Sequence, residues 1–223
     1  MSMIRPSKIA SVISLTLLFT SAVGFSQPNK IGDAKFLLPL ENEVVHEINT
    51  ARAAPKEYSD LLEQWKKYYD KKILKLPGET PLLTNEGVSA LIDAIQFLCP
   101  MKSVPLLSPS KGMSLGAKDH VKDQGRLSAG QHKGSDGSQP WDRVNRYGIW
   151  ERSIGENISY GSDKARNIVM YLIIDDGVLS RGHRKNLLNP DFRVIGVACG
   201  HHATYETVCV ITFAGGYKEK SGK

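Results

Sequence analysis

Apolar residues in the first half of the chain recur at the three- and four-residue spacing that is typical of one helix face. The first such stretch contains Val44, Val45, Ile48 and Ala51. Because proline is tolerated in a first helical turn, Pro55 predicts the start of a second helix, whose apolar stripe extends to Ile73. The sequence therefore predicts two consecutive amphipathic helices.

Four further helices are predicted from their flanking residues, since Ser, Asn and Asp favour helix starts, whereas Gly and Pro favour helix ends. They are expected from Asn85 to Pro100, from Ser110 to Gly125, from Ser138 to Gly148, and from Ser162 or Asp163 through Leu172. Pro77-Gly78 marks a break before the first of them.

The pattern changes near the C-terminus, where β-branched residues dominate. Residues 194–198 and 208–213 form two β-rich runs, which the loop from Gly200 to Thr207 joins most simply as an antiparallel hairpin. Helices that precede strands favour an α+β layered domain over a repeated βαβ fold. We expect one domain over residues 40–217, with a linker at 27–39 before it and a tail at 218–223 after it.

The N-terminus has the layout of a secretory signal. Arg5 and Lys8 precede an apolar run from Ile9 to Phe19, and small residues follow. Cleavage after Ser26 would remove residues 1–26, and cleavage after Ala22 is a second option. The alternative is an uncleaved anchor, for which the apolar run has about the minimum length. A cleaved signal predicts a secreted or periplasmic protein without stable membrane insertion.

The chain has 223 residues and a formal net charge of +6, part of which belongs to the signal segment. The remaining excess is modest, so nucleic-acid binding, which needs a concentrated basic face, is not favoured. Five lysines at positions 66, 67, 71, 72 and 75 lie mostly off the stripe of the second predicted helix. They could contact anionic lipid or glycan, although a solvated face is the simpler interpretation.

Three cysteines are too few for a scaffold built on disulfides. Cys199 and Cys209 flank the predicted hairpin and come opposite each other if its loop centres near Thr204. An oxidising compartment would favour a bond between them. Cys99 would stay unpaired, as a buried apolar side chain.

Three short polar segments place a histidine or carboxylate among glycines, where backbone can approach a ligand closely. They are residues 130–138, 155–158 and 180–190. Zinc-protease, paired-cysteine, phosphate-loop, dinucleotide and nucleophile-elbow motifs are absent from the sequence.

These segments resemble the CAP superfamily, also called the SCP domain, in a bacterial form. The resemblance covers about residues 40–217. It begins with Asn49, Arg52 and Pro55, and continues through the segment Leu115-Gly116-Ala117-Lys118-Asp119-His120. The loop around His132, the segment Gly155-Glu156-Asn157 and the segment Gly182-His183-Arg184 follow in the family's order.

The resemblance implies a three-layer α-β-α sandwich with a central cleft. In the family, two histidines and two acids face this cleft and can bind a divalent ion. His132, Glu156 and His183 match three of those positions. Zinc suits such a set, with zinc or another divalent cation as a cofactor that is not obligatory.

The fourth position is where this chain departs from the family. Ile174 stands where the acid belongs, and Asp175 and Asp176 follow it. If the preceding helix continued, Asp176 would lie on its inward face, four positions after Leu172. Asp176 is therefore the predicted fourth ligand, with Asp175 or no acid as the alternatives.

Other polar residues are interpreted as structural. His120 is expected to be a hydrogen-bonded core histidine, Asn157 to satisfy backbone groups, and Arg52 to be an anchor. Asp136 and Ser138 are expected to form a turn and a cap, and His201 and His202 to be exposed in the hairpin loop.

The leading functional hypothesis is a secreted protein that acts by binding a lipid, sterol, glycan or protein. The alternative is a metal-dependent hydrolase that uses His132, Glu156 and His183 around a bound water. A cell-surface structural module is the third hypothesis. The sequence leaves enzymatic activity and oligomeric state open, because fold does not settle function.

Overall fold

The computed structural model of the chain describes residues 32–125 and 131–220. The predicted signal at residues 1–26 lies outside these residues and stays a prediction. The helices are α1 (Pro39–Ala53), α2 (Pro55–Glu63), the 3-10 helix η1 (Lys66–Tyr68), α3 (Val88–Leu98), α4 (Lys111–Gln124), α5 (Pro140–Asn145), α6 (Ala165–Ile174) and α7 (Gly182–Leu187). The strands are β1 (Tyr69–Asp70), β2 (Ile73–Leu74), β3 (Leu82–Leu83), β4 (Ser108–Pro109), β5 (Gly148–Tyr160), β6 (Val194–His202) and β7 (Glu206–Glu219).

The main sheet has the strand order β4-β6-β7-β5. The predicted hairpin is confirmed, because β6 and β7 pair antiparallel with Val197 opposite Ile211. β5 pairs antiparallel with the other edge of β7, and short β4 pairs parallel with β6. β7 continues to Glu219, whose carboxylate accepts hydrogen bonds from the Ser110 hydroxyl and the Gly112 nitrogen.

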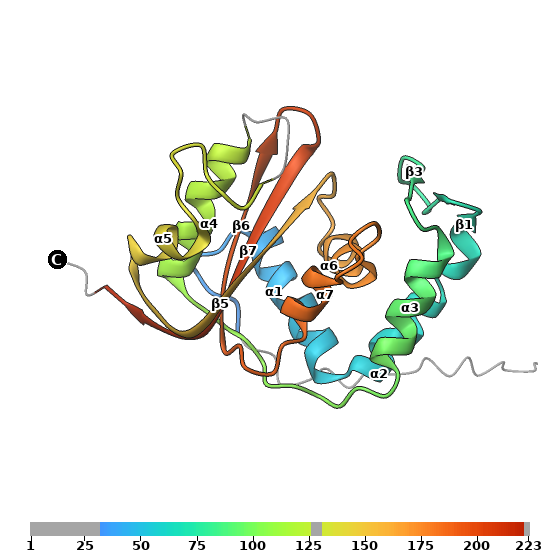
Figure 1. Cartoon of the computed structure of the whole chain (residues 1–223), viewed down its shortest axis with the longest axis horizontal. Helices are drawn as coiled ribbons and strands as arrows, with labels where there is room; N and C mark the ends of the chain where they lie inside the picture. The colour runs from blue at the N-terminus through green and yellow to red at the C-terminus, as the bar shows by residue number, and fades with distance from the viewer. Residues whose placement is uncertain (1–31, 126–130, 221–223) are drawn as a thin grey trace, which may run out of the picture.

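Helices cover both faces of this sheet, which confirms the α-β-α sandwich (Figure 1). α4 and α5 lie on one face, and α1, α6 and α7 lie on the other. α2 and α3 pack against each other outside the second helical layer. Within the described ranges, no helix is both long and apolar enough to cross a membrane.

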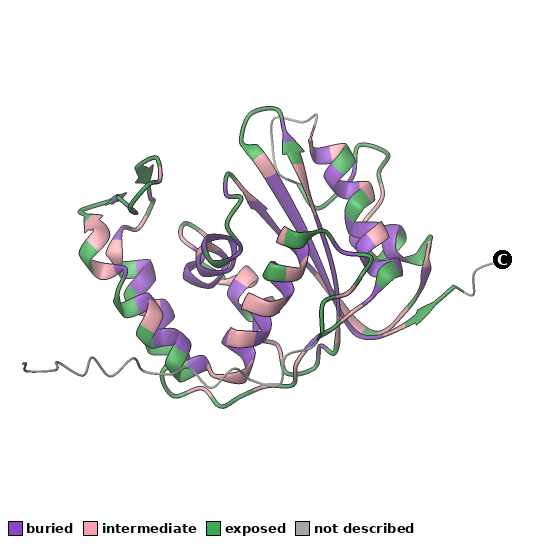
Figure 2. Cartoon of the chain, turned by 180° about the vertical axis from the view of Figure 1, so that it is seen from behind, coloured by how far each residue is buried: buried purple, intermediate pink, exposed green. Residues whose placement is uncertain are grey.

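Buried residues gather on the sheet and on the helix faces that cover it (Figure 2). The largest cluster joins α1, α3 and α6 to β6 and β7, with Leu91, Ile168 and Phe213 fully buried. Burial of each such side chain contributes about 1.5–3 kcal/mol. On the other face, Gly196 allows α4 to approach closely, since a Cβ atom there would lie 2.3 Å from the Met113 carbonyl carbon.

The second predicted helix is shorter than expected. α2 ends at Glu63, and the chain then forms η1 and the small antiparallel sheet β1-β2-β3. Tyr69 pairs with Leu74 around a tight loop in which Lys71 has φ of 56°. A stripe containing Tyr and Ile suits a strand as well as a helix, and cross-strand pairing decides between them here. We call residues 66–83, which hold the five lysines, the β1–β3 lobe.

Three predictions about the cysteines and the hairpin loop also have clear outcomes. The Cys199–Cys209 disulfide is present and links facing positions of β6 and β7. Cys99 is unpaired in the described chain as predicted, but it is exposed and not buried. His202 was expected to be exposed and is instead fully buried, because its Nδ1 accepts hydrogen bonds from the backbone nitrogens of Thr204 and Tyr205.

Candidate functional site

Glu156 lies in the middle of β5, opposite Thr212 of β7, with its side chain only 1% exposed. The sequence did not predict this strand, because its burial does not alternate in the way that identifies a half-buried strand. Arg143 of α5 donates from Nη2 to both Glu156 oxygens, at 3.0 and 2.8 Å. A buried carboxylate is thus paired with a buried guanidinium, as burial of a charge requires.

His132 joins this ion pair from the loop before α5. Its Nδ1 lies 3.0 Å from Glu156 Oε1, while its imidazole is 52% exposed. Arg143 also donates to the His132 carbonyl, so it holds both the backbone of His132 and the acid that binds its ring. Glu156 therefore orients the His132 ring from the protein interior, and the rest of the ring is exposed to solvent.

His120 of α4 lies behind this group and is fully buried, as predicted. Its Nε2 is hydrogen-bonded to the Gln131 carbonyl at 2.8 Å, and it lies 3.9 Å from Glu156 Oε1. Desolvation by burial lowers the pKa of His120, which favours the neutral ring. The residue is part of the core of the sandwich.

His183 forms a second pair with Asp175. The ring Nδ1 of His183 donates to Asp175 Oδ1 at 2.7 Å, and the backbone nitrogens of His183 and Arg184 donate to Oδ2. The Asp175 side chain is 1% exposed and the His183 side chain is 27% exposed. The imidazole Nε2 makes no hydrogen bond within the described residues, so it is available to a ligand.

Asp176 does not lie beside His183. α6 ends at Ile174, and Asp175 follows in the left-handed conformation with φ of 58°, so the helix does not continue to carry Asp176 inward. The Asp176 carboxylate instead accepts from the backbone nitrogens of Asn85 and Glu86, at 2.6 and 2.8 Å. Of the two candidate acids, Asp175 is the one that contacts a histidine.

A short amide network links the two pairs. Asn157, next to Glu156 on β5, donates to the His183 carbonyl at 3.0 Å. Asn186 of α7 donates to the Asn157 side chain at 2.9 Å and to the Glu156 carbonyl at 3.3 Å. Asn157 therefore satisfies neighbouring backbone, as predicted, and also ties β5 to α7.

The residues do not fit a metal ion in this arrangement. Among residues 32–125 and 131–220, no group of three His, Cys, Asp or Glu side chains is placed to hold one. Arg143 already occupies both Glu156 oxygens, and Asp176 is bound to the segment before α3. The histidines form two separate carboxylate pairs, so we derive no metal-dependent step from them.

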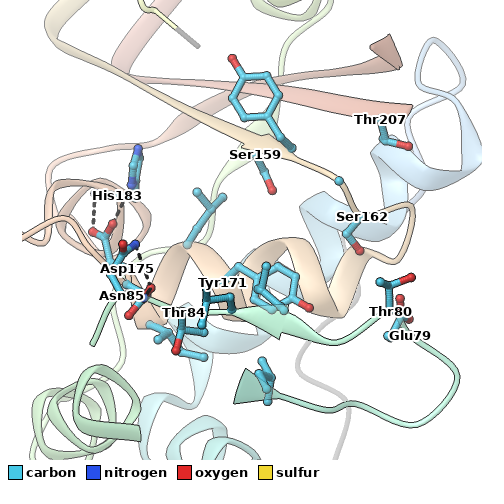
Figure 3. A pocket seen from close by; sticks show the side chains of 18 of the residues that line it. Glu79, Thr80, Thr84, Asn85, Ser159, Ser162, Tyr171, Asp175, His183 and Thr207 are labelled. Atoms are coloured by element: carbon cyan, nitrogen blue, oxygen red, sulfur yellow. Dashed lines mark hydrogen bonds and ion pairs between the residues drawn. The ribbon is translucent and has the colours of Figure 1, made fainter. Parts of the chain in front are cut away.

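A pocket of about 630 Å³ lies beside the His183–Asp175 pair. Figure 3 shows this pair at one end, Glu79, Thr80 and Ser162 at the other, and Tyr171 of α6 between them. The apolar and aromatic lining comprises Tyr69, Leu74, Leu82, Leu83, Ile158, Tyr160, Tyr171, Leu172, Ile174 and Val178. His132 and Glu156 are not among the lining residues.

Sequence reasoning missed the walls of this pocket. Tyr69, Leu74 and Leu82 belong to the β1–β3 lobe, and Tyr171 and Leu172 belong to α6. Residues so far apart in sequence carry no shared motif. The available signal was the surplus of aromatic and apolar residues around the five lysines, which exceeds what one short helix buries.

The structure confirms most of the other polar predictions, but Ser138 is not the predicted cap, because α5 begins one residue later with Gln139 at its N-cap position. Arg52 is fully buried and donates to four backbone carbonyls, so it is an anchor. Asp136 accepts from the Ser138 nitrogen within a turn. Ser110 caps α4 by accepting from the Met113 nitrogen.

Solved structures from three organisms are similar to this chain. An outer surface protein of Borrelia burgdorferi is 20% identical, with 52% of this chain and 80% of that chain covered and a TM-score of 0.43. An extracellular protein of Bacillus anthracis that contains an SCP domain is 23% identical, with 57% and 37% covered and a TM-score of 0.41. Schistosoma mansoni venom allergen-like protein 4 is 14% identical, with 83% and 92% covered and a TM-score of 0.45.

Among curated sequences, the uncharacterized Bacillus subtilis protein YkwD is 32% identical over 85 residues. This match covers 38% of the present chain and 31% of that protein, so the chain spans about a third of its relative. The profile of the CAP family, described as the cysteine-rich secretory protein family, matches residues 45–213. That range includes both histidine–carboxylate pairs and most of the sandwich, and the chain belongs to the CAP family.

Proposed function

We propose that this protein is an exported binding protein that holds an uncharged, hydroxyl-bearing lipid in the pocket beside His183. The observation that carries the proposal is the pocket itself, which has an apolar and aromatic middle and a histidine at one end. Its volume of about 630 Å³ is within the range of small-molecule sites.

The middle of the pocket favours a hydrocarbon. Leu74 and Leu82 contribute from the β1–β3 lobe, and Tyr171 and Leu172 contribute from α6. Transfer of a hydrocarbon from water to such a wall is favourable by about 0.8 kcal/mol for each buried CH₂ group. A polar glycan would gain little from this part of the surface.

The histidine end favours an uncharged headgroup. When the His183 ring is neutral, Nδ1–H donates to Asp175 and Nε2 is left as an acceptor. The carboxylates of Asp175 and Asp176 also line this end, and they would repel a ligand carboxylate. A lipid hydroxyl that donates to Nε2 satisfies both conditions.

The test is displacement of a fluorescent lipid from the purified protein by glycerol monooleate, oleate or soluble oligosaccharides. We expect glycerol monooleate to displace the probe and oleate to do so at least tenfold less well. Ser159→Trp, which fills the pocket from β5, should abolish probe binding. Ser103→Trp, at an exposed loop position outside the lining, is the matched control. Displacement by oligosaccharide alone, or equal binding by both variants, would refute the proposal.

Export to the secreted or periplasmic compartment is part of this proposal. It is supported by the signal-like N-terminus and by membership of a family described as secretory. N-terminal mass mapping of exported protein should find residues 1–26 removed, or 1–22 if the second site is used. An intact Met1 on exported protein would contradict the cleaved signal.

A further inference from the structure

The β1–β3 lobe exposes apolar side chains to solvent. Leu83 is 75% exposed, Leu82 is 44% exposed and Ile73 is 36% exposed. Ile73 pairs with Leu83 across β2 and β3, so both side chains leave the same face of this small sheet. A leucine and an isoleucine paired on one exposed face form a patch, which isolated surface leucines do not.

Lysines lie next to this patch in the chain, at positions 71, 72 and 75 beside Ile73. The lobe carries five lysines, at positions 66, 67, 71, 72 and 75, against two carboxylates, Asp70 and Glu79. Lys75 contacts Asp70 at 2.7 Å, and Glu79 is bound by Lys164 of the neighbouring segment. Lys71 and Lys72 are exposed and form no ion pair with any described residue. The loop between β1 and β2 is therefore positive next to exposed hydrocarbon.

This combination identifies the kind of partner. Lysines alone would suit any polyanion, and an apolar patch alone would suit another protein surface. Exposed leucine and isoleucine side chains beside unpaired lysines complement the interface of an anionic bilayer, which presents phosphates above hydrocarbon.

We propose that the β1–β3 lobe docks reversibly onto an anionic phospholipid surface. Leu83 and Ile73 enter the headgroup region, while Lys71 and Lys72 lie against the phosphates. This proposal does not depend on the lipid bound in the pocket. Leu74, Leu82 and Leu83 of the same lobe line the pocket, so docking would also place the pocket mouth at the membrane.

Sedimentation with vesicles tests the proposal, using the processed chain recovered after export. We expect binding to vesicles of phosphatidylcholine with 25% phosphatidylglycerol, and little binding to phosphatidylcholine alone. Lys71→Glu/Lys72→Glu should reduce binding by at least about 25-fold, since each lysine near an anionic surface contributes about fivefold. Leu83→Ser should reduce it by about tenfold.

Matched controls use exposed positions elsewhere. Ile149→Ser, at a side chain that is 63% exposed at the start of β5, and Lys118→Glu/Lys122→Glu on α4 should bind as the wild type does. Equal loss in the control and lobe variants would overturn the proposal, as would a wild type that does not bind anionic vesicles.

The pocket variant separates the two proposals. Ser159→Trp lies outside the lobe, and it should retain vesicle binding even though it loses the pocket ligand. If Ser159→Trp abolished vesicle sedimentation while Leu83→Ser did not, the vesicle signal would come from lipid uptake and the docking proposal would fail. Failure of probe binding with intact sedimentation would count against the pocket function alone.

Discussion

Asp175 accepts two hydrogen bonds from His183, one from the ring Nδ1 at 2.7 Å and one from the backbone nitrogen at 2.9 Å. Its left-handed φ of 58° ends α6 and turns the carboxylate towards the first turn of α7. The Asp175 backbone therefore ends α6, while its buried carboxylate binds the start of α7 and orients the His183 imidazole.

Replacement of Asp175 should destabilise the protein and release the His183 ring. Asp175→Ala leaves the ring and two backbone nitrogens without their acceptor, so we expect a loss of about 2–3 kcal/mol in the free energy of unfolding. Urea unfolding measures this loss, and ¹⁵N NMR of the imidazole should report a changed tautomer balance. Asp176→Ala is the control and should leave the His183 resonances in place; a tautomer shift in that variant would contradict the assignment.

Glu86 should make stability sensitive to acid. Arg181 donates to both of its oxygens, at 2.6 and 2.7 Å, and the Gly177 nitrogen donates as well, which together lower the pKa of Glu86 to about 2. Because the pKa is lower in the folded state, this contribution is complete above about pH 4.5 and is lost as pH falls towards about 2. Glu86→Gln should flatten the pH dependence of unfolding in this window.

The matched control for Glu86 is Glu57→Gln, at an exposed position in α2. Its unfolding curve should follow the wild-type pH dependence. An unchanged acid slope in Glu86→Gln would show that the pair with Arg181 does not form in solution.

Reduction of the disulfide should lower stability without changing the fold. Cys199 and Cys209 are ten residues apart. In the chain-entropy model, a disulfide that closes so short a loop increases the free energy of unfolding by about 3 kcal/mol. Guanidinium unfolding of Cys199→Ser/Cys209→Ser against the wild type measures the difference. Cys99→Ser should unfold as the wild type does, and a bridge to Cys99 in non-reducing peptide maps would be inconsistent with the structure.

The Arg143–Glu156 pair should be strongly coupled. Arg143→Met leaves a buried carboxylate without its partner and should cost about 3–5 kcal/mol. Adding Glu156→Met should recover much of this loss, because no unpaired buried charge remains. Two single-variant losses that simply add in the double variant would argue against the buried pair.

Zinc should not stabilise the protein by more than about 1 °C in a thermal scan, even in excess. The expectation follows from the absence of a three-ligand group in residues 32–125 and 131–220 and from the occupation of Glu156 by Arg143. A larger zinc-dependent rise that disappears in His132→Ala/His183→Ala would overturn this expectation and support the metal site predicted from the sequence.

Much of the architecture could be predicted from local patterns. Ser110 and Gly125 frame α4, Pro140 begins α5, and the β-branched runs pair as β6 and β7, because caps, fixed proline angles and strand periodicity act within a few residues. The pairing of Cys199 with Cys209 follows from the same hairpin register. The order of the CAP family motifs in the sequence also identified His132 and His183 as candidate site residues.

The partners of those histidines were decided only by the tertiary structure. A left-handed residue at Asp175 ends α6 one position before Asp176, and no local rule distinguishes two consecutive aspartates. Arg143, which holds Glu156, comes from a helix thirteen positions earlier in the chain and reaches β5 only because α5 packs on it. The pocket depends in the same way on pairing in the β1–β3 lobe, where the sequence suited both a helix and a strand, and contacts between distant segments selected the strand.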